Sequence, residues 1–135
     1  MEGPAYKLRI AMLWVIDMVA FFAYRTIALN ESATEVTVLS NSELATVLLI
    51  MMAFAFLSMV VKSGFNRLMN LIAGAIFALL QAIMLGDGLT AYPTAVFNLM
   101  TGAAVFSMGA VVWLAARWPK VPVDASAPDA SPHPQ

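Results

Sequence analysis

The sequence contains no cysteine, and its single histidine, His133, lies in the C-terminal tail. The lack of cysteine excludes disulfides, thiolate metal sites and cysteine nucleophiles. Without a second histidine, a histidine-based metal site or catalytic triad is not available within one chain. The sequence also has no nucleophile–base pair and no phosphate-binding loop. We therefore expect a protein that is not an enzyme and that holds neither a metal ion nor a cofactor.

Charged residues are scarce as well. They make up 11% of the 135-residue chain, whereas an ordinary soluble domain has about 25%. The formal net charge of -1 argues against the basic surface with which proteins bind nucleic acid. Hydrophobic residues make up 61% of the chain, and its mean hydropathy is +0.83. A soluble chain of this length could not bury so much apolar surface, so the composition indicates an integral membrane protein in contact with the lipid bilayer.

Long apolar runs occur four times, and a helix needs roughly 20 apolar residues to cross a hydrocarbon core of about 30 Å. The runs predict an all-α, polytopic four-helix bundle over residues 1–120, with spans at about 8–29, 44–62, 67–86 and 92–116. Ser40 and Glu43 have capping-box spacing just before the second span. Residues 121–135 are rich in Pro, Ala and Ser, and we expect them to form a disordered cytoplasmic tail.

The basic residues indicate the orientation of the bundle. Six of the seven Lys and Arg residues fall on one side of a four-span layout: Lys7, Arg9, Lys62, Arg67, Arg117 and Lys120. The loops on the opposite side, residues 30–43 and 87–91, contain none and carry acidic residues. Because cytoplasmic loops are enriched in Lys and Arg, the sequence predicts that both termini are cytoplasmic.

Polar residues inside the spans are expected to face other helices, because exposing them to lipid is costly. The third span carries polar or small residues on one helical face: Arg67, Asn70, Gly74 and Gln81. The fourth span carries a comparable set: Asn98, Gly102, Gly109 and Trp113. A polar residue one turn before a glycine lets a second helix approach closely and form a hydrogen bond. Both faces are therefore predicted to pack between helices.

The depth of the polar residues follows from a rise of about 1.5 Å per helical residue. Gln81 and Asn98 are predicted to share a level in the outer leaflet. Arg25 is expected at that level or just above it, where its long side chain can reach the acidic outer loop. Asn70 is expected deep on the cytoplasmic side.

Asp17 is the most costly of these residues, because an acid at the centre of a span costs roughly 2.5–3.5 kcal/mol on insertion scales. It is predicted near the midplane, where Thr101 and Ser107 are the nearest polar residues in depth. Two interpretations stay open: a structural hydrogen-bonding group between helices, or the proton or cation site of a transporter. Trp14 and Tyr24 share its helical face and could line a pocket for a flat or cationic ligand, although such stripes more often pack.

Several positions together resemble a known family: Leu13-Trp14 with Asp17 in the first span, Arg67, Asn70 and Gly74 opening the third, Tyr92 opening the fourth, and Trp113 and Trp118 closing it. In this layout the sequence resembles the DoxX-like proteins, small bacterial four-helix membrane proteins, over about residues 8–119. The resemblance implies the four-helix fold and the bacterial cytoplasmic (inner) membrane, and it implies no reaction. That family commonly has an acid in the fourth span where this sequence has Asn98, so no site residue is carried over.

Two functions are consistent with these features. The first is a non-enzymatic scaffold or accessory subunit of a membrane assembly, in which Asp17 and the other polar residues join helices. The second is a small proton-coupled transporter of cations or amphiphiles that works as a dimer, with Asp17 as its proton site. Small multidrug transporters are similar in length and in the acid of the first span, but this sequence lacks their glycine motif. Four short helices barely enclose a cavity, so we expect a homodimer or association with other membrane subunits.

Overall fold

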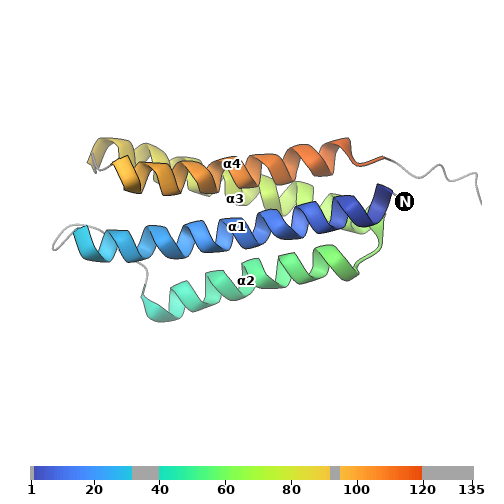
Figure 1. Cartoon of the computed structure of the whole chain (residues 1–135), viewed down its shortest axis with the longest axis horizontal. Helices are drawn as coiled ribbons and strands as arrows, with labels where there is room; N and C mark the ends of the chain where they lie inside the picture. The colour runs from blue at the N-terminus through green and yellow to red at the C-terminus, as the bar shows by residue number, and fades with distance from the viewer. Residues whose placement is uncertain (1, 32–39, 92–94, 120–135) are drawn as a thin grey trace, which may run out of the picture.

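The computed structural model describes residues 2–31, 40–91 and 95–119, which form four long helices in up-and-down order (Figure 1). The helices are α1 (Glu2–Glu31), α2 (Asn41–Val60), α3 (Ser63–Ala91) and α4 (Ala95–Arg117). Each contains a stretch long and apolar enough to cross a membrane: Pro4–Ile27, Asn41–Val60, Ser63–Thr90 and Asn98–Arg117. The prediction of an all-α, four-span membrane protein is therefore confirmed. The predicted tail at 121–135 and Tyr92 lie outside the described residues.

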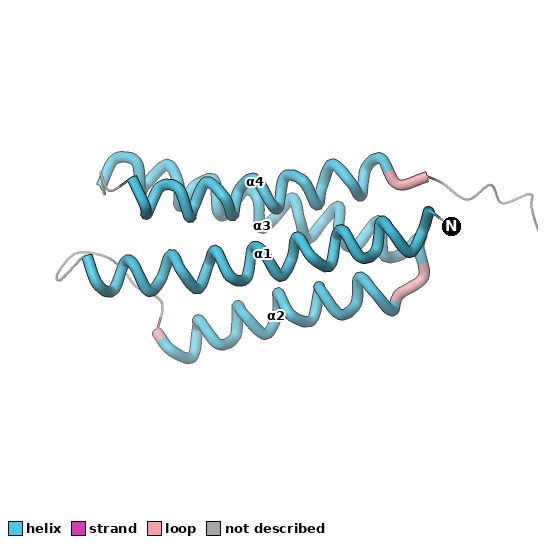
Figure 2. Tube along the Cα trace, in the orientation of Figure 1, coloured by secondary structure: helices cyan, strands magenta, loops and turns pink. Residues whose placement is uncertain are grey.

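The beginning of α2 has the capping box that the sequence predicts. The Glu43 backbone N–H donates to Ser40 Oγ at 3.3 Å, and the Ser40 backbone N–H donates to the Glu43 carboxylate at 2.7 Å. This helix ends at a tight turn, where Val61 is extended and its N–H donates to the Leu57 carbonyl at 3.0 Å. Helix α3 begins immediately afterwards, so α2 and α3 are held close together at this turn (Figure 2).

Helix α3 is longer than the sequence predicts, because it begins at Ser63 and continues to Ala91. The predicted outer loop at 87–91 is therefore wrong: these residues form the last turn of the helix. Thr90 Oγ1 supports that turn by donating to the Asp87 carbonyl at 2.9 Å. The nearby Gly86 costs a helix only about 1 kcal/mol relative to alanine, which is too little to end it.

Helix α1 occupies a central place in the packing. It contacts α2 on one side and α4 on the other, and α4 in turn contacts α3, whereas α2 and α3 contact each other far less. Figure 1 shows α2 at the edge of the bundle, with α1 between it and α4. The bundle is thus closed along three helix pairs and comparatively open along the seam between α2 and α3.

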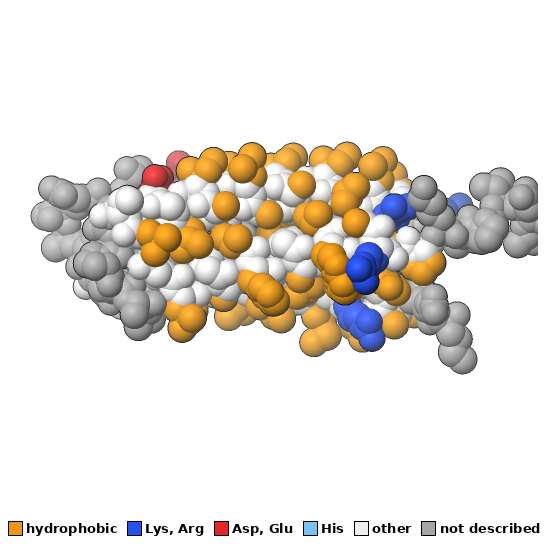
Figure 3. Space-filling view, turned by 90° about the horizontal axis from the view of Figure 1, so that it is seen from above, with side chains coloured by type: hydrophobic (Ala, Val, Ile, Leu, Met, Phe, Trp, Pro, Cys, Tyr) orange, Lys and Arg blue, Asp and Glu red, His pale blue; other side chains and the backbone are white. Residues whose placement is uncertain are grey.

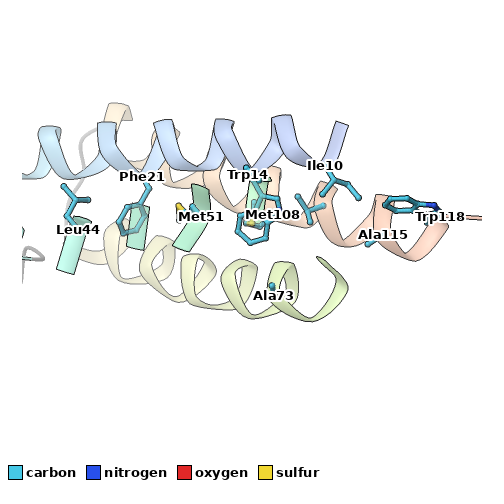
Figure 4. Close-up of a cluster of buried hydrophobic side chains, with 11 residues drawn as sticks. Ile10, Trp14, Phe21, Leu44, Met51, Ala73, Met108, Ala115 and Trp118 are labelled. Atoms are coloured by element: carbon cyan, nitrogen blue, oxygen red, sulfur yellow. The ribbon is translucent and has the colours of Figure 1, made fainter. Parts of the chain in front are cut away.

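The buried apolar side chains follow the long axis of the bundle (Figure 4). Phe21 and Leu44 lie near the end where α2 begins, Trp14 and Met108 lie further along, and Trp118 lies at the opposite end. Large apolar side chains are also exposed on all four helices. A helix that is apolar all round is suited to a lipid environment, where its outward side chains contact acyl chains.

The two ends of the bundle differ in charge. In Figure 3 the visible Lys and Arg side chains lie at the end that holds the N-terminus, and the visible Asp and Glu side chains lie at the opposite end. At the basic end, Tyr6 stacks on Trp118 with ring centroids 5.6 Å apart. Arg67 Nε also donates to the Ala115 carbonyl at 2.9 Å and so caps the end of α4. The described ends of the chain therefore meet on one side of the bundle.

Candidate functional site

Asp17 is fully buried in the middle of α1, where its carboxylate meets side chains from two other helices. Gln81 Nε2 in α3 donates to both Asp17 oxygens, at 2.8 Å each. Ser107 Oγ in α4 lies 3.3 Å from Asp17 Oδ1 and 2.9 Å from the Ala104 carbonyl, so its one hydrogen is shared between these acceptors. Asp17 thereby links α1 to both α3 and α4.

The pairing of Gln81 with Asp17 differs from the sequence-based depths, which place Gln81 well outward of Asp17. Counted from the observed helix starts at Glu2 and Ser63, the two residues differ by three positions, or about 4.5 Å in height. Side chains on a helix lean toward its N-terminus, and the long Gln81 side chain covers this difference. Counted from the predicted starts at residues 8 and 67, the two residues differ by five positions. The predicted starts are late by six and four residues, and this two-residue mismatch adds about 3 Å to the predicted difference in height. Ser107, in contrast, lies where the predicted depth places it.

A second buried network joins α1, α2 and α3 nearer the basic end. Asn70 Oδ1 accepts hydrogen bonds from Trp14 Nε1 at 2.7 Å and from Ser58 Oγ at 3.1 Å. Asn70 Nδ2 donates to the Asn66 carbonyl at 2.9 Å, and Asn66 Nδ2 donates to the Ser58 carbonyl at 2.6 Å. All four side chains are completely buried. Sequence reasoning missed Ser58 and Asn66, although the one-turn spacing of Asn66 and Asn70 was an available signal.

Three aromatic rings separate the two polar layers. Trp14 stacks on Phe54 of α2 with centroids 4.9 Å apart and meets Phe77 of α3 edge-on at 5.3 Å. Its indole thus fills the space between α2 and α3 while its N–H bonds to Asn70. Trp14 is therefore a packed core residue in this structure, and the residues that line the nearby cavity do not include it.

A cavity of about 330 Å³ lies on the other side of this aromatic layer, between α2 and α3. Its lining is apolar except for one residue, Gln81, which is 3% exposed. The lining residues are Phe21 of α1, Val47 of α2, and Phe77, Leu80, Gln81, Ile83 and Met84 of α3. Gln81 Oε1 is buried and has no hydrogen-bond partner among the described residues. One side chain thus connects the cavity wall to Asp17.

The remaining predicted site residues lie toward the acidic end of the bundle. Tyr24 stacks on Phe21 with centroids 6.1 Å apart. Arg25 Nη2 donates to Asn41 Oδ1 at 2.6 Å and so ties the end of α1 to the beginning of α2. Thr101 is buried and Asn98 is half-buried, and each takes part in a further polar or ring contact. None of these four side chains lines the cavity.

The face of α4 that packs within the chain differs from the predicted one. An added Cβ at Gly102 or Gly109 would meet no atom within 4 Å, and Trp113 is 54% exposed. The prediction that the face with Gly102, Gly109 and Trp113 packs against other helices is therefore wrong for contacts within one chain. The buried residues of α4 lie on another face: Thr101, Ala104, Ser107, Met108, Val111 and Ala115. Apart from the adjacent Ser107 and Met108, these residues are three or four positions apart, which was a signal in the sequence. On α3, by contrast, the predicted face does pack, since Gly74 lies against Val111.

Within the described ranges 2–31, 40–91 and 95–119, no three His, Cys, Asp or Glu side chains gather where they could hold a metal ion. Comparisons with protein-family models, curated proteins and solved structures find no significant match to this chain. The resemblance to the DoxX-like proteins therefore stays a prediction based on the layout of the sequence.

Proposed function

We propose that the protein is a non-enzymatic scaffold or accessory subunit of a membrane assembly. The observation that carries this proposal is the bonding of Asp17, whose two oxygens accept hydrogen bonds from Gln81 of α3 and whose Oδ1 lies beside Ser107 of α4. A buried acid bonded in this way serves as a junction between helices. Asp17 is also not among the residues that line the cavity between α2 and α3. Its first role is therefore to hold the bundle together.

A second candidate function is a small proton-coupled transporter that works as a dimer, with Asp17 as the proton site. The observation in its favour is the position of Gln81, which bonds to Asp17 and also forms part of the cavity wall. A cation or amphiphile in the cavity would contact the residue next to the acid. Transporters use acids within membrane spans as proton or cation sites, and Asp17 is such an acid.

The two functions are separated by flux and proton-release measurements on the purified chain. The protein is reconstituted in liposomes with a pH gradient and exposed to a panel of organic cations and neutral amphiphiles. The scaffold function predicts no flux and no proton release, with Asp17→Asn and the control Asp87→Asn behaving alike. A flux that well-folded Asp17→Asn abolishes and Asp87→Asn retains would overturn the scaffold function and support the transporter.

The orientation that we propose places the basic end of the bundle, with both described chain ends, in the cytoplasm. Its support is the enrichment of Lys and Arg at that end (Figure 3), because positively charged residues are retained on the cytoplasmic side. The membrane that the DoxX-like layout implies is the cytoplasmic (inner) membrane of a bacterium.

Partners of this chain are proposed to be a second copy or other membrane subunits. Support comes from α4, where Gly102 and Gly109 leave open space on the outward face around the 77%-exposed Phe106. Small residues on a lipid-facing helix let another helix approach closely.

A further inference from the structure

Two arginine side chains lie at the end of α4, one from α3 and one from α4 itself. Arg67 Nε donates to the Ala115 carbonyl at 2.9 Å, and its Nη2 donates to the Ala116 carbonyl at 3.3 Å. The Arg117 guanidinium lies over the Trp113 ring, 4.7 Å from the ring centroid. Because Ala116 and Arg117 are consecutive residues, both guanidinium groups are held at the same end of one helix.

The charge of these two arginines is not balanced within the described part of the chain. Their partners there are two carbonyl groups and an aromatic ring, and none of these carries a full negative charge. The acids whose side chains the structure describes lie elsewhere, since Asp17 is buried inside the bundle and Glu43 and Asp87 are at its opposite end. The terminal carbonyls of a helix supply only about half a negative charge. The end of α4 therefore has an excess of positive charge.

Both guanidinium groups also keep N–H donors for a further partner. A guanidinium has five N–H groups in a planar fork that matches the oxygens of a phosphate group. Arg67 uses two of its nitrogens for the carbonyls of α4. Arg117, in contrast, contacts the face of a ring, which leaves its N–H groups directed past the ring edge. A phosphate would accept hydrogen bonds from these donors and offset the charge.

The depth of the arginines favours a lipid over a soluble anion. Arg67 lies near the beginning of the apolar stretch Ser63–Thr90. Arg117 is the last residue of the apolar stretch Asn98–Arg117. An arginine at the end of a span can extend into water, but the Arg117 guanidinium turns back over Trp113, one helical turn further into the stretch. It is therefore held at the boundary of the hydrocarbon core, where the phosphate groups of phospholipids lie.

Trp113 supplies an apolar surface next to this charge. Its side chain is 54% exposed, and it lies within the same apolar stretch as Arg117. Tryptophan is enriched at the membrane interface, where its ring lies at the level of the headgroups. A phospholipid would thus meet a guanidinium at its phosphate and an aromatic ring at the upper part of its acyl chain.

We propose that the end of α4 binds an anionic phospholipid, whose phosphate accepts hydrogen bonds from Arg117 and whose acyl chain lies against Trp113. Arg67 adds a second positive charge at this helix end, so a lipid with a net negative headgroup is preferred to a zwitterionic one. The site goes beyond the scaffold function and does not depend on it. It also does not depend on which end of the bundle faces the cytoplasm.

Lys62 supplies a matched control for the general attraction between a basic surface and anionic lipids. It is exposed in the turn between α2 and α3, which lies at the same end of the bundle but not at the end of α4. Lys62→Gln and Arg117→Gln each remove one positive charge from that end. A lipid that responds only to the net charge should therefore lose affinity equally in both variants.

The test uses the full chain in phosphatidylcholine vesicles that contain a phosphatidylglycerol brominated near the headgroup end of its acyl chain. Bromine quenches tryptophan fluorescence on contact, and Trp113 is exposed whereas Trp14 and Trp118 are buried. Quenching at increasing fractions of this lipid, compared with a phosphatidylcholine brominated at the same position, gives the relative affinity. We expect a preference of at least about tenfold for phosphatidylglycerol, and no displacement by soluble glycerol phosphate.

The variants locate the binding to the end of α4. Arg117→Gln is expected to lower the preference for phosphatidylglycerol about fivefold, because one charge near the membrane surface is lost. Lys62→Gln is expected to change it by less than about twofold, since salt screens charges beyond about 10 Å. Trp113→Phe is expected to remove most of the quenching. Arg117 and Trp113 are both exposed, so neither change should unfold the bundle, and circular dichroism checks this.

Four results would overturn the proposal. These are equal affinity for the two brominated lipids, an equal loss in Arg117→Gln and Lys62→Gln, quenching that persists in Trp113→Phe, and displacement of the lipid by glycerol phosphate. The second result would reduce the site to a general attraction between charges, and the fourth would identify a soluble anion as the ligand. None of these results bears on the Asp17 junction, which the flux measurements test separately.

Discussion

Asp17 and Gln81 form a buried hydrogen-bonded pair, in which the acceptors of position 17 match the donor of position 81. The Gln81 amide nitrogen donates to both Asp17 oxygens, and the Gln81 carbonyl oxygen has no hydrogen-bond partner among the described residues. Asparagine at position 17 would offer an oxygen that accepts and an N–H that can donate to this carbonyl. Leucine would offer neither, and the buried Gln81 amide would lose its acceptors. The chemistry of position 17 therefore matters more than its size.

We expect Asp17→Asn to retain the stability of the bundle to within about 0.5 kcal/mol, and Asp17→Leu to lower the free energy of unfolding by about 1–2 kcal/mol. Unfolding in mixed micelles, followed by circular dichroism, measures both values. Equal stability of the two variants would show that the bonds from Gln81 contribute nothing to the fold.

Asn70 is the centre of the other network, because its oxygen accepts from Trp14 and from Ser58. Asn70→Leu leaves both donors buried without that acceptor, so we expect a loss of about 1–3 kcal/mol in the free energy of unfolding. Leu79→Ala on the same helix is the control, since Leu79 is 64% exposed and its loss should change the value little. Unfolding in mixed micelles measures both variants. If Asn70→Leu lowers the free energy of unfolding no more than Leu79→Ala does, the network around Asn70 does not stabilise the bundle.

At the scale of the helix, what the sequence predicts depends on the kind of signal. The beginning of α2 was predictable, because Ser40 and Glu43 form a local motif whose spacing alone defines the bonds. The inner face of α3 was also predictable, since Asn70 and Gln81 are costly in lipid and have to turn inward. This second signal is strong because a polar side chain that faced lipid instead would be costly.

The packed face of α4 was not predictable by the same reasoning. Glycine and alanine cost little on either side of a helix in lipid, so Gly102 and Gly109 can face outward without penalty. The Asp17–Gln81 pair depended on the relative heights of α1 and α3. The predicted starts of these helices are late by different amounts, and the mismatch of two residues, about 3 Å, concealed the pair. The seam between α2 and α3 depends on how far these helices diverge, which no local pattern in the sequence reports.

Three glycines of α3 and α4 differ in how closely the neighbouring helix approaches them. A Cβ at Gly74 would lie 3.0 Å from a Val111 methyl group, whereas a Cβ at Gly102 or Gly109 would meet no atom of another part of the described chain within 4 Å. We expect Gly74→Leu to separate α3 from α4 and to cost about 1–3 kcal/mol of stability. Gly102→Leu and Gly109→Leu are expected to leave the single chain as stable as before or slightly more stable, because leucine favours helix more than glycine does.

The measurement is the free energy of unfolding at low protein density in micelles, where association between copies is suppressed. A loss at Gly74 no larger than at the other two positions would contradict the close approach of α3 and α4. A loss at Gly102 that appears only at high protein density would instead identify the outward face of α4 as a contact between copies.

On the scale of the whole molecule, the separation of charge along the bundle predicts its orientation. The basic end holds the turn at Lys62, and the opposite end holds Asp87. Positively charged flanks remain in the cytoplasm during insertion. Because the chain has no cysteine, a single introduced thiol reports one position, and Lys62 and Asp87 are both exposed.

We expect a membrane-impermeant maleimide to label Asp87→Cys in intact cells and to label Lys62→Cys only after the cells are opened. Phe56→Cys is the control for membrane burial, since Phe56 is exposed on the outside of α2 within its apolar stretch and should resist the reagent in both conditions. The reverse pattern would invert the orientation of the bundle. Labelling of Lys62→Cys and Asp87→Cys from the same side would instead contradict a membrane crossing by α3, because the two positions lie at opposite ends of that helix.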